Sequence, residues 1–233
     1  MEVGANVKNL KVGDRVAMEP GKTCGQCEFC KSGKYNLCED VVFFATPPVD
    51  GVFQEYVAHE AGLCFKLPDN VSTLEGALIE PLAVGMHAAR QGEAKLGQTA
   101  VVTGAGCIGL VSLLSLKAMG VTKVIVVDVM ENRLQKALEL GADAVINGKT
   151  EDTVARIKEL TDGKGFDLGI EPAGNQITDP RSEEGCHHRF CRIQCKRRDD
   201  VADRHVSGQG TDLQDGIPLP QHLPDRNRSG CTG

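Results

Sequence analysis

A glycine-rich turn between a strand-like and a helix-like segment, in the sequence VVTGAGCIGLVSLL, constrains this fold most. Its glycines Gly104, Gly106 and Gly109 have the spacing G-x-G-x-x-G. The apolar run TAVVT before it is typical of a buried parallel strand, and CIGLVSLLSLKAMG after it predicts a helix that ends at Gly120. The glycine triplet alone is a weak signal, so its surroundings decide its meaning.

Strand-like and helix-like segments alternate through residues 87–178. KVIVVD, DAVING and FDLGIEPAG are apolar enough for buried strands, whereas MENRLQKALELG and EDTVARIKELTDG place apolar residues at helical spacing. This alternation predicts an α/β protein with a doubly wound parallel sheet of four strands, open at its outer edge.

In that context the glycine-rich turn predicts a dinucleotide site. Asp128 ends the second strand, nineteen residues after Gly109. Gly104 would make the tight turn, Gly106 would let the backbone approach a pyrophosphate, and Gly109 would let the helix pack on the strand. The helix N-terminus offers free N–H groups to phosphate. Asp128 would accept hydrogen bonds from ribose hydroxyls and repel a 2′-phosphate, which favours NAD over NADP. The alternative is a structural glycine turn in another α/β protein.

Cysteines form the second notable pattern. The stretch TCGQCEFCKSGKYNLC spaces four of the ten cysteines as C-x2-C-x2-C-x7-C, at Cys24, Cys27, Cys30 and Cys38. Four thiolates complete the tetrahedral shell of a structural zinc ion and leave no position for water. An iron–sulfur cluster or free thiols are the alternatives, although ferredoxin spacing has three residues before the last cysteine. Cys64 and Cys107 are single and flanked by apolar residues, which predicts buried side chains.

Residues 1–86 contain many glycines and prolines and short strand-like runs such as GDRVAME and FQEYVAHE, which predict irregular β structure. The net charge of −6 gives no reason to expect nucleic acid or a membrane surface as a partner. Neither a membrane-length apolar run nor a signal peptide is visible, so we expect a cytoplasmic protein.

The composition changes abruptly at Asp179. Only 4 of the 17 Lys and Arg residues before this point are Arg, whereas 8 of the 9 from this point onward are. Residues 179–233 also hold four of the six histidines and lack helical or strand periodicity, so we expect them to be disordered. Their nine basic residues are balanced by nine acidic ones, which argues against a nucleic-acid-binding tail.

Several segments together resemble the zinc-dependent medium-chain alcohol dehydrogenases, most closely their sorbitol (polyol) dehydrogenase branch. These segments are VGDRVAMEPG, the four-cysteine stretch, FFATPPVDGVFQEYVAH, CFKLPDNVSTLEGALIEPLAVGMHA, GAGCIGL and VDVMENRLQKALELGA. The resemblance runs from residue 2 to about residue 178. It implies a partial GroES-like catalytic domain over 1–86 and a partial NAD-binding Rossmann domain over 87–178. The change of composition at Asp179 leads us to expect an out-of-frame tail over 179–233.

The resemblance also implies roles for individual residues. Glu80, in LIEPLAVG, matches a carboxylate beside the catalytic zinc, and Ile108, Asp128 and Arg133 match the lining of the NAD site. If the resemblance is set aside, the alternative for Glu80 is a residue of a surface loop. The alternative for Arg133 is a solvated helix residue that faces Glu139 or Asp143. The implied reaction is oxidation of a secondary alcohol or polyol to a ketone, with Zn²⁺ and NAD as cofactors.

Two departures from the family pattern limit this expectation: segments with catalytic-zinc ligands are missing, and the sheet of the family continues for two more strands after EPAGNQIT, where the composition of this chain changes. The other catalytic-zinc ligands of the family lie in C-G-x-D and G-H-E segments, and neither occurs here. We therefore expect that this chain alone turns over no substrate. The family assembles as oligomers, and we expect oligomers of this chain to be weakened. The alcohol stays open among polyols, butanediol and threonine. A non-catalytic zinc- and nucleotide-binding fragment is the alternative from another functional class.

The change at Asp179 yields a prediction about the gene. Codons can be written for residues 179–233 so that reading one nucleotide later gives a stop-free sequence with the segment EAKKGATIVFVGYSA, a helix end followed by a buried strand. We expect the coding DNA, read in this frame after Thr178, to encode the next strands of the sheet. Sequencing the DNA across this position checks the prediction, and a stop codon or an unrelated sequence in that frame would contradict it.

Overall fold

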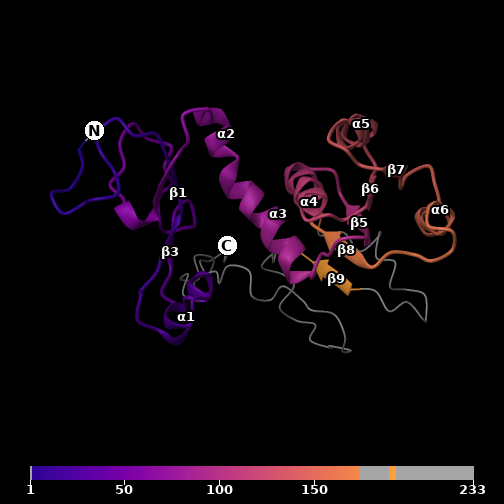
Figure 1. Cartoon of the computed structure of the whole chain (residues 1–233), viewed down its shortest axis with the longest axis horizontal. Helices are drawn as coiled ribbons and strands as arrows, with labels where there is room; N and C mark the ends of the chain where they lie inside the picture. The colour runs from indigo at the N-terminus through magenta and orange to yellow at the C-terminus, as the bar shows by residue number, and fades with distance from the viewer. Residues whose placement is uncertain (1, 174–188, 193–233) are drawn as a thin grey trace, which may run out of the picture. The chain divides into compact units, whose positions relative to one another are not determined.

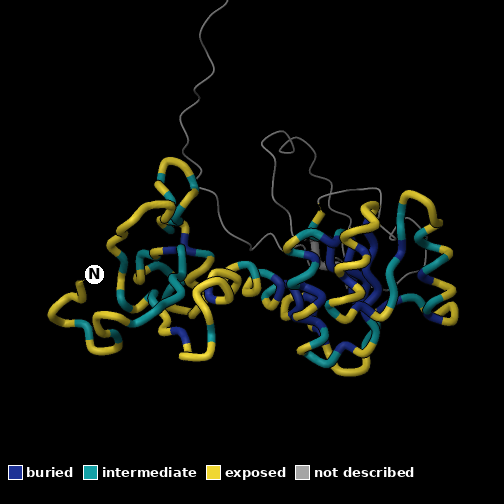
Figure 2. Tube along the Cα trace, turned by 90° about the horizontal axis from the view of Figure 1, so that it is seen from above, coloured by how far each residue is buried: buried dark blue, intermediate teal, exposed yellow. Residues whose placement is uncertain are grey.

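The computed structural model describes residues 2–173 and 189–192 of the chain (Figure 1). The chain divides into two compact units, with the boundary between Gly76 and Ala77. The domain boundaries at residues 86 and 178 stay predictions. Figure 2 shows that the two units differ in character, because buried residues are concentrated in the second and sparse in the first.

The first unit contains short antiparallel pairs and small helices. Strand β1 (Val16–Met18) pairs with β4 (Cys64–Lys66), and β2 (Gly21–Lys22) pairs with β3 (Val42–Phe43). The helices are α1 (Glu28–Lys31), α2 (Thr73–Ala77) and the 3-10 turns η1 (Tyr35–Leu37) and η2 (Ala61–Leu63). This agrees with the predicted irregular β structure and confirms a strand in GDRVAME.

The strand predicted for FQEYVAHE is wrong, because residues 53–60 form no strand. A strand needs a hydrogen-bonding neighbour, and no described segment pairs with this one. Its large side chains are correspondingly exposed: Phe53 completely and Tyr56 by 75%.

The second unit contains the predicted doubly wound sheet. The strands β5 (Thr99–Thr103), β6 (Lys123–Asp128), β7 (Ala144–Asn147) and β8 (Leu168–Glu171) are all parallel. Helix α3 (Ile79–Gln91) precedes the sheet, and α4 (Cys107–Ala118), α5 (Glu131–Glu139) and α6 (Thr153–Leu160) connect its strands. The sheet order is β7-β6-β5-β8-β9. Successive strands are added on one side of β5 up to β7, and β8 is then added on the other side of β5, so the strand order reverses there. Each element predicted between residues 99 and 171 is present.

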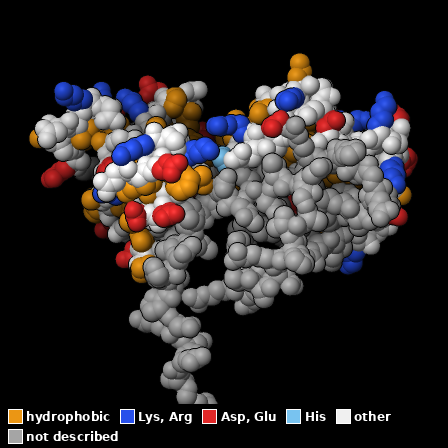
Figure 3. Space-filling view, turned by 90° about the horizontal axis from the view of Figure 1, so that it is seen from below, with side chains coloured by type: hydrophobic (Ala, Val, Ile, Leu, Met, Phe, Trp, Pro, Cys, Tyr) orange, Lys and Arg blue, Asp and Glu red, His pale blue; other side chains and the backbone are white. Residues whose placement is uncertain are grey.

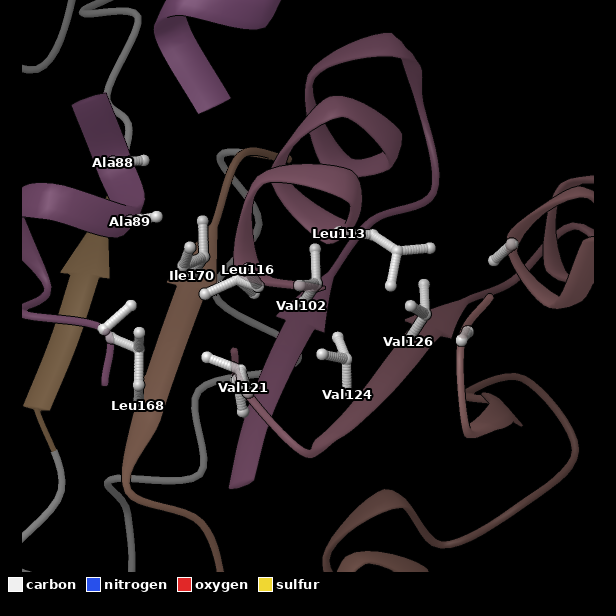
Figure 4. Packing of buried hydrophobic residues seen from close by; sticks show 14 of the residues in the cluster. Ala88, Ala89, Val102, Leu113, Leu116, Val121, Val124, Val126, Leu168 and Ile170 are labelled. Atoms are coloured by element: carbon white, nitrogen blue, oxygen red, sulfur yellow. The ribbon is translucent and has the colours of Figure 1, made fainter. Parts of the chain in front are cut away.

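Apolar side chains cover both faces of this sheet. On one face, residues of α3 and α4 such as Ala89, Leu113 and Leu116 pack against Val102 and Ile170 (Figure 4). The other face buries a second cluster, Val101, Ile125, Val127, Ile146, Ile157 and Phe166, which includes a residue of α6. Burial on both faces explains why these strands are continuous apolar runs without alternation.

A fifth strand corrects the expectation of a four-stranded sheet followed by a disordered tail. Strand β9 (Arg189–Arg192) runs parallel to β8, with Arg189 in register with Leu168 and Arg192 with Glu171. Strand β8 therefore has a neighbour on its outer edge. β9 coincides with the apolar segment IVFVG that the alternative reading frame permits at residues 188–192. The predictions for residues 174–188 and 193–233 lie outside the described residues.

Two surface observations bear on the expected partners. Within the described part of the chain, no helix combines the length and apolar character required to cross a membrane. On the face in Figure 3, the visible basic and acidic side chains of described residues are interspersed and do not gather into one basic patch.

Candidate metal and cofactor sites

The four predicted cysteines lie together in the first unit. The Sγ atoms of Cys24, Cys27, Cys30 and Cys38 all lie within 4.8 Å of one another. The Sγ atoms of Cys24 and Cys30 are 3.9 Å apart. Four sulfurs around a zinc ion at the usual bond length of about 2.3 Å are about 3.8 Å apart, so the quartet is close to tetrahedral spacing.

Local backbone structure brings these thiols together. Cys27 caps α1, and its sulfur accepts a hydrogen bond from the N–H of Cys30 at 3.4 Å. The sulfur of Cys24 accepts from the N–H of Cys27 at 3.3 Å, and that of Cys38 accepts from the N–H of Cys24 at 3.4 Å. Backbone N–H groups aimed at sulfur stabilise thiolates, which are the form that binds metal.

The pKa values of the thiols differ from one another. Hydrogen bonds from the backbone N–H groups of Gln26 and Cys27 lower the pKa of Cys24 to about 7. Burial raises the pKa of Cys38, because desolvation disfavours the thiolate. A bound divalent cation would supply the positive charge that lets all four lose their protons. The donor set and its spacing therefore fit a zinc ion with four thiolate ligands.

This quartet is also the main ordering element of its unit. Within residues 2–76, the buried apolar side chains are those of Cys38 and Leu67. So small an apolar core does not stabilise a unit of this size, and small folds of this kind depend on disulfides or metals. A metal ion held by the quartet would therefore stabilise the first unit.

The glycine-rich turn in the second unit has the geometry predicted for it. Gly104 has φ +112°, a conformation that favours glycine. A Cβ on Gly109 would lie 1.7 Å from the carbonyl oxygen of Gly104, so helix α4 approaches the turn as closely as it does only because this residue lacks one. A Cβ on Gly106, at the start of α4, would meet nothing within 4 Å, so this side of the turn is open to a ligand.

Asp128 stands at the end of β6, beside this turn. Its Oδ2 accepts a hydrogen bond from the N–H of Ala105 at 2.7 Å, and its Oδ1 accepts from the N–H of Met130 at 2.8 Å. Only 9% of the residue is exposed. A carboxylate fixed at this place next to a glycine-rich turn could accept hydrogen bonds from the ribose of a dinucleotide.

Arg133 lies close to the same carboxylate. Its Nη1 is 3.9 Å from Oδ2 of Asp128. The predicted role of Arg133 in lining the NAD site stays a prediction. The alternative partners are wrong, because Glu139 pairs with Lys136 and Asp143 with Lys117, each at 2.9 Å. Helix α5 begins just after β6, and this places its first turn beside the end of that strand.

The other predicted residues are placed as follows. Ile108 is half-buried in the first turn of α4. Cys107, predicted to be buried, is exposed, because it begins α4 beyond the end of β5. Cys64 is half-buried. Glu80 lies exposed in the first turn of α3 and belongs to no group of possible metal ligands among the residues described.

One buried acidic residue, Glu171, was not identified from the sequence. Glu171 ends β8, is completely buried, and accepts a hydrogen bond through Oε1 from the N–H of Ala173 at 2.7 Å. The available signal was an acid that follows an apolar strand, the same pattern that identified Asp128. It was missed because no charged residue is expected inside a doubly wound sheet.

These features define a class of protein: an α/β fold with a dinucleotide-type glycine-rich turn and a small β-rich unit with four clustered cysteine thiols that fit a zinc ion. Residues 107–186 match the family described as Zinc-binding dehydrogenase, and residues 1–69 match the family described as Alcohol dehydrogenase GroES-like domain. The chain belongs to the zinc-type medium-chain alcohol dehydrogenase family.

Individual relatives agree with this assignment. An uncharacterized zinc-type alcohol dehydrogenase-like protein of Escherichia coli is 50% identical over 177 residues, which are 76% of this chain and 51% of the relative. Human sorbitol dehydrogenase is 50% identical over 179 residues, 76% of this chain and 50% of the relative. An alcohol dehydrogenase of Escherichia coli CFT073, solved with NADH, has a TM-score of 0.74 and 32% identity, with 82% of this chain and 56% of that chain covered. The chain spans about half the length of these relatives.

A cysteine substitution tests the metal site. We expect Cys38→Ser to lose about one zinc ion per chain and to make residues 2–76 sensitive to protease, because structural zinc contributes on the order of 10 kcal/mol to folding. Residues 77–171 should stay resistant, since their core is apolar. Zinc analysis and limited proteolysis with mass spectrometry measure both effects. Cys64→Ser, outside the quartet, is the control, and full zinc content in Cys38→Ser would contradict a four-thiolate site.

Proposed function

We propose that this chain is part of an NAD-dependent, zinc-containing oxidoreductase that oxidises a polyol or secondary alcohol to a ketone. One observation carries the proposal: the open glycine-rich turn at Gly106 lies beside the buried carboxylate of Asp128, at the carboxyl end of a doubly wound sheet. Dinucleotides bind at this edge, where the strand order reverses.

Charge favours NAD over NADP. Both carboxylate oxygens of Asp128 accept backbone N–H groups, which hold the carboxylate beside the glycine-rich turn. A 2′-phosphate on the adenosine ribose would place negative charge against this carboxylate. Arg133, whose guanidinium lies 3.9 Å away, offsets only part of that repulsion because its side chain is 55% exposed.

The quartet is proposed to hold a structural zinc. Four thiolates fill all positions of a tetrahedral ion, so this zinc would stabilise the first unit without contacting substrate. A catalytic zinc needs a position open to the alcohol, where it lowers the energy of the alkoxide. Glu80 is proposed to stand near such an ion in the complete enzyme.

The substrate class rests on similarity. Polyols are favoured because sorbitol dehydrogenase is among the relatives at about half identity, while butanediol and threonine are the other candidates. The complete enzyme is proposed to act on a small alcohol as a homo-oligomer, with neither nucleic acid nor a membrane as partner.

Gly106→Val tests cofactor binding. A Cβ at this position meets nothing within 4 Å and the backbone φ is −75°, so we expect the thermal stability to change by no more than about 1 kcal/mol. The same side chain would keep the pyrophosphate away from the turn, and NADH should bind at least about tenfold more weakly. NADH fluorescence titration measures the affinity. Gly62→Val, also free of contacts, is the control; unchanged NADH affinity in Gly106→Val would refute the proposed site.

Catalysis by the chain alone is a separate question. We expect no NAD-linked oxidation of sorbitol or xylitol by the purified, zinc-loaded chain, because its described residues offer the thiolate quartet as a metal site and Glu80 has no partner ligands there. Absorbance of NADH at 340 nm records turnover, and human sorbitol dehydrogenase serves as the positive control. Measurable turnover would show that this chain assembles a second metal site. Tight NADH binding without turnover would identify a binding fragment.

A further inference from the structure

We propose that two buried carboxylates, Asp128 and Glu171, are positioning residues that hold the glycine-rich turn in its phosphate-binding shape before any cofactor arrives. Strand β5 leads into this turn and lies between β6 and β8 in the sheet. Asp128 ends β6 and Glu171 ends β8, so one acid stands on each side of the turn.

On the β6 side, the contact to the turn is direct. Oδ2 of Asp128 accepts the N–H of Ala105, the residue between the first two glycines, at 2.7 Å. The N–H of Gly104 donates to the carbonyl oxygen of Val127 at 2.6 Å. Two successive N–H groups of the turn are therefore fixed to the end of β6, and Ala105 is itself buried.

On the β8 side, Glu171 contacts the turn indirectly, through the two residues that follow the strand. Oε1 of Glu171 accepts the N–H of Ala173 at 2.7 Å. The Cβ of Ala173 lies 3.0 Å from the position a Cβ would take on Gly104, and Cγ of Pro172 lies 3.6 Å from the corresponding position on Gly109. Glu171 thus holds residues 172 and 173 against the back of the turn.

Burial makes these contacts strong. Asp128 is 9% exposed and Glu171 is not exposed at all, so little water competes for their hydrogen bonds. A tight turn closed only by its own backbone would fluctuate, and the cofactor would then have to order it at a cost in affinity.

Asp143 provides a comparison within the same sheet, with a side chain that is 35% exposed. Its Oδ2 accepts the N–H of Val124 at 2.6 Å, near the start of β6, and it also pairs with Lys117. The chemistry resembles that of Asp128, but the location is the opposite edge of the sheet, away from the glycine-rich turn. Replacing Asp143 should weaken the hydrogen bonding near the start of β6 and leave the glycine-rich turn unchanged.

Amide hydrogen exchange of the full zinc-loaded chain without cofactor tests the proposal. We expect Asp128→Ala to speed exchange at Ala105 at least about tenfold, since a hydrogen bond to a charged group is lost. Glu171→Gln, which keeps the shape of the side chain but replaces one carboxyl oxygen with an amide group, should speed exchange at Ala173 and in the turn by several-fold. Asp143→Asn should leave exchange at Ala105 within about twofold of the native rate while it changes exchange at Val124.

Two results would overturn the proposal. The first is a rate at Ala105 that stays within about twofold of native in Asp128→Ala. The second is an equal increase at Ala105 in Asp143→Asn, because it would show general loosening of the sheet. If Glu171→Gln does not fold, Asp128→Ala still decides the role of the direct contact.

The proposal rests on the proposed dinucleotide function, and a binding measurement separates the two. Glu171 is completely buried, so a weaker NADH affinity in Glu171→Gln with unchanged melting temperature would reflect positioning. If native protein binds no NADH while the exchange rates change as expected, the positioning role stands and the dinucleotide function fails.

Discussion

The close approach of helix α4 to the turn after β5 is the contact on which the second unit depends. It exists because Gly109 has no Cβ, which would otherwise stand 1.7 Å from the carbonyl oxygen of Gly104. This approach seats Leu113 and Leu116 against the sheet and leaves the N-terminus of α4 free beside the end of β6. One small residue thus serves both the apolar core and the proposed phosphate site.

The two units are stabilised by different means. The second buries apolar side chains on both faces of a parallel sheet, and this burial supplies most of its stability. The first buries few, and four closely spaced thiols take the place of a core. A metal ion would therefore determine the order of the first unit, whereas the second could form without one.

Segments around residues 53–60 and 189–192 show how far pairing depends on context. The first contains Phe53, Tyr56 and Val57, residue types that are frequent in strands, yet forms none, because no described strand lies beside it. The second has two arginines in four residues and still pairs with β8. Whether a segment forms a strand depends on its neighbours as much as on its own residues. The sequence pattern therefore gave the wrong prediction for both segments.

The sequence alone determined the elements from residue 99 to 171, the glycine-rich turn and the cysteine quartet, because each depends on spacing within a short stretch of chain. Only the tertiary structure decided which groups meet across strands. It paired Arg133 with Asp128, exposed Cys107, and brought Glu171 behind the turn that begins at Gly104. These contacts join residues far apart in the chain, and only the pairing of parallel strands brings the ends of β6, β5 and β8 to one edge.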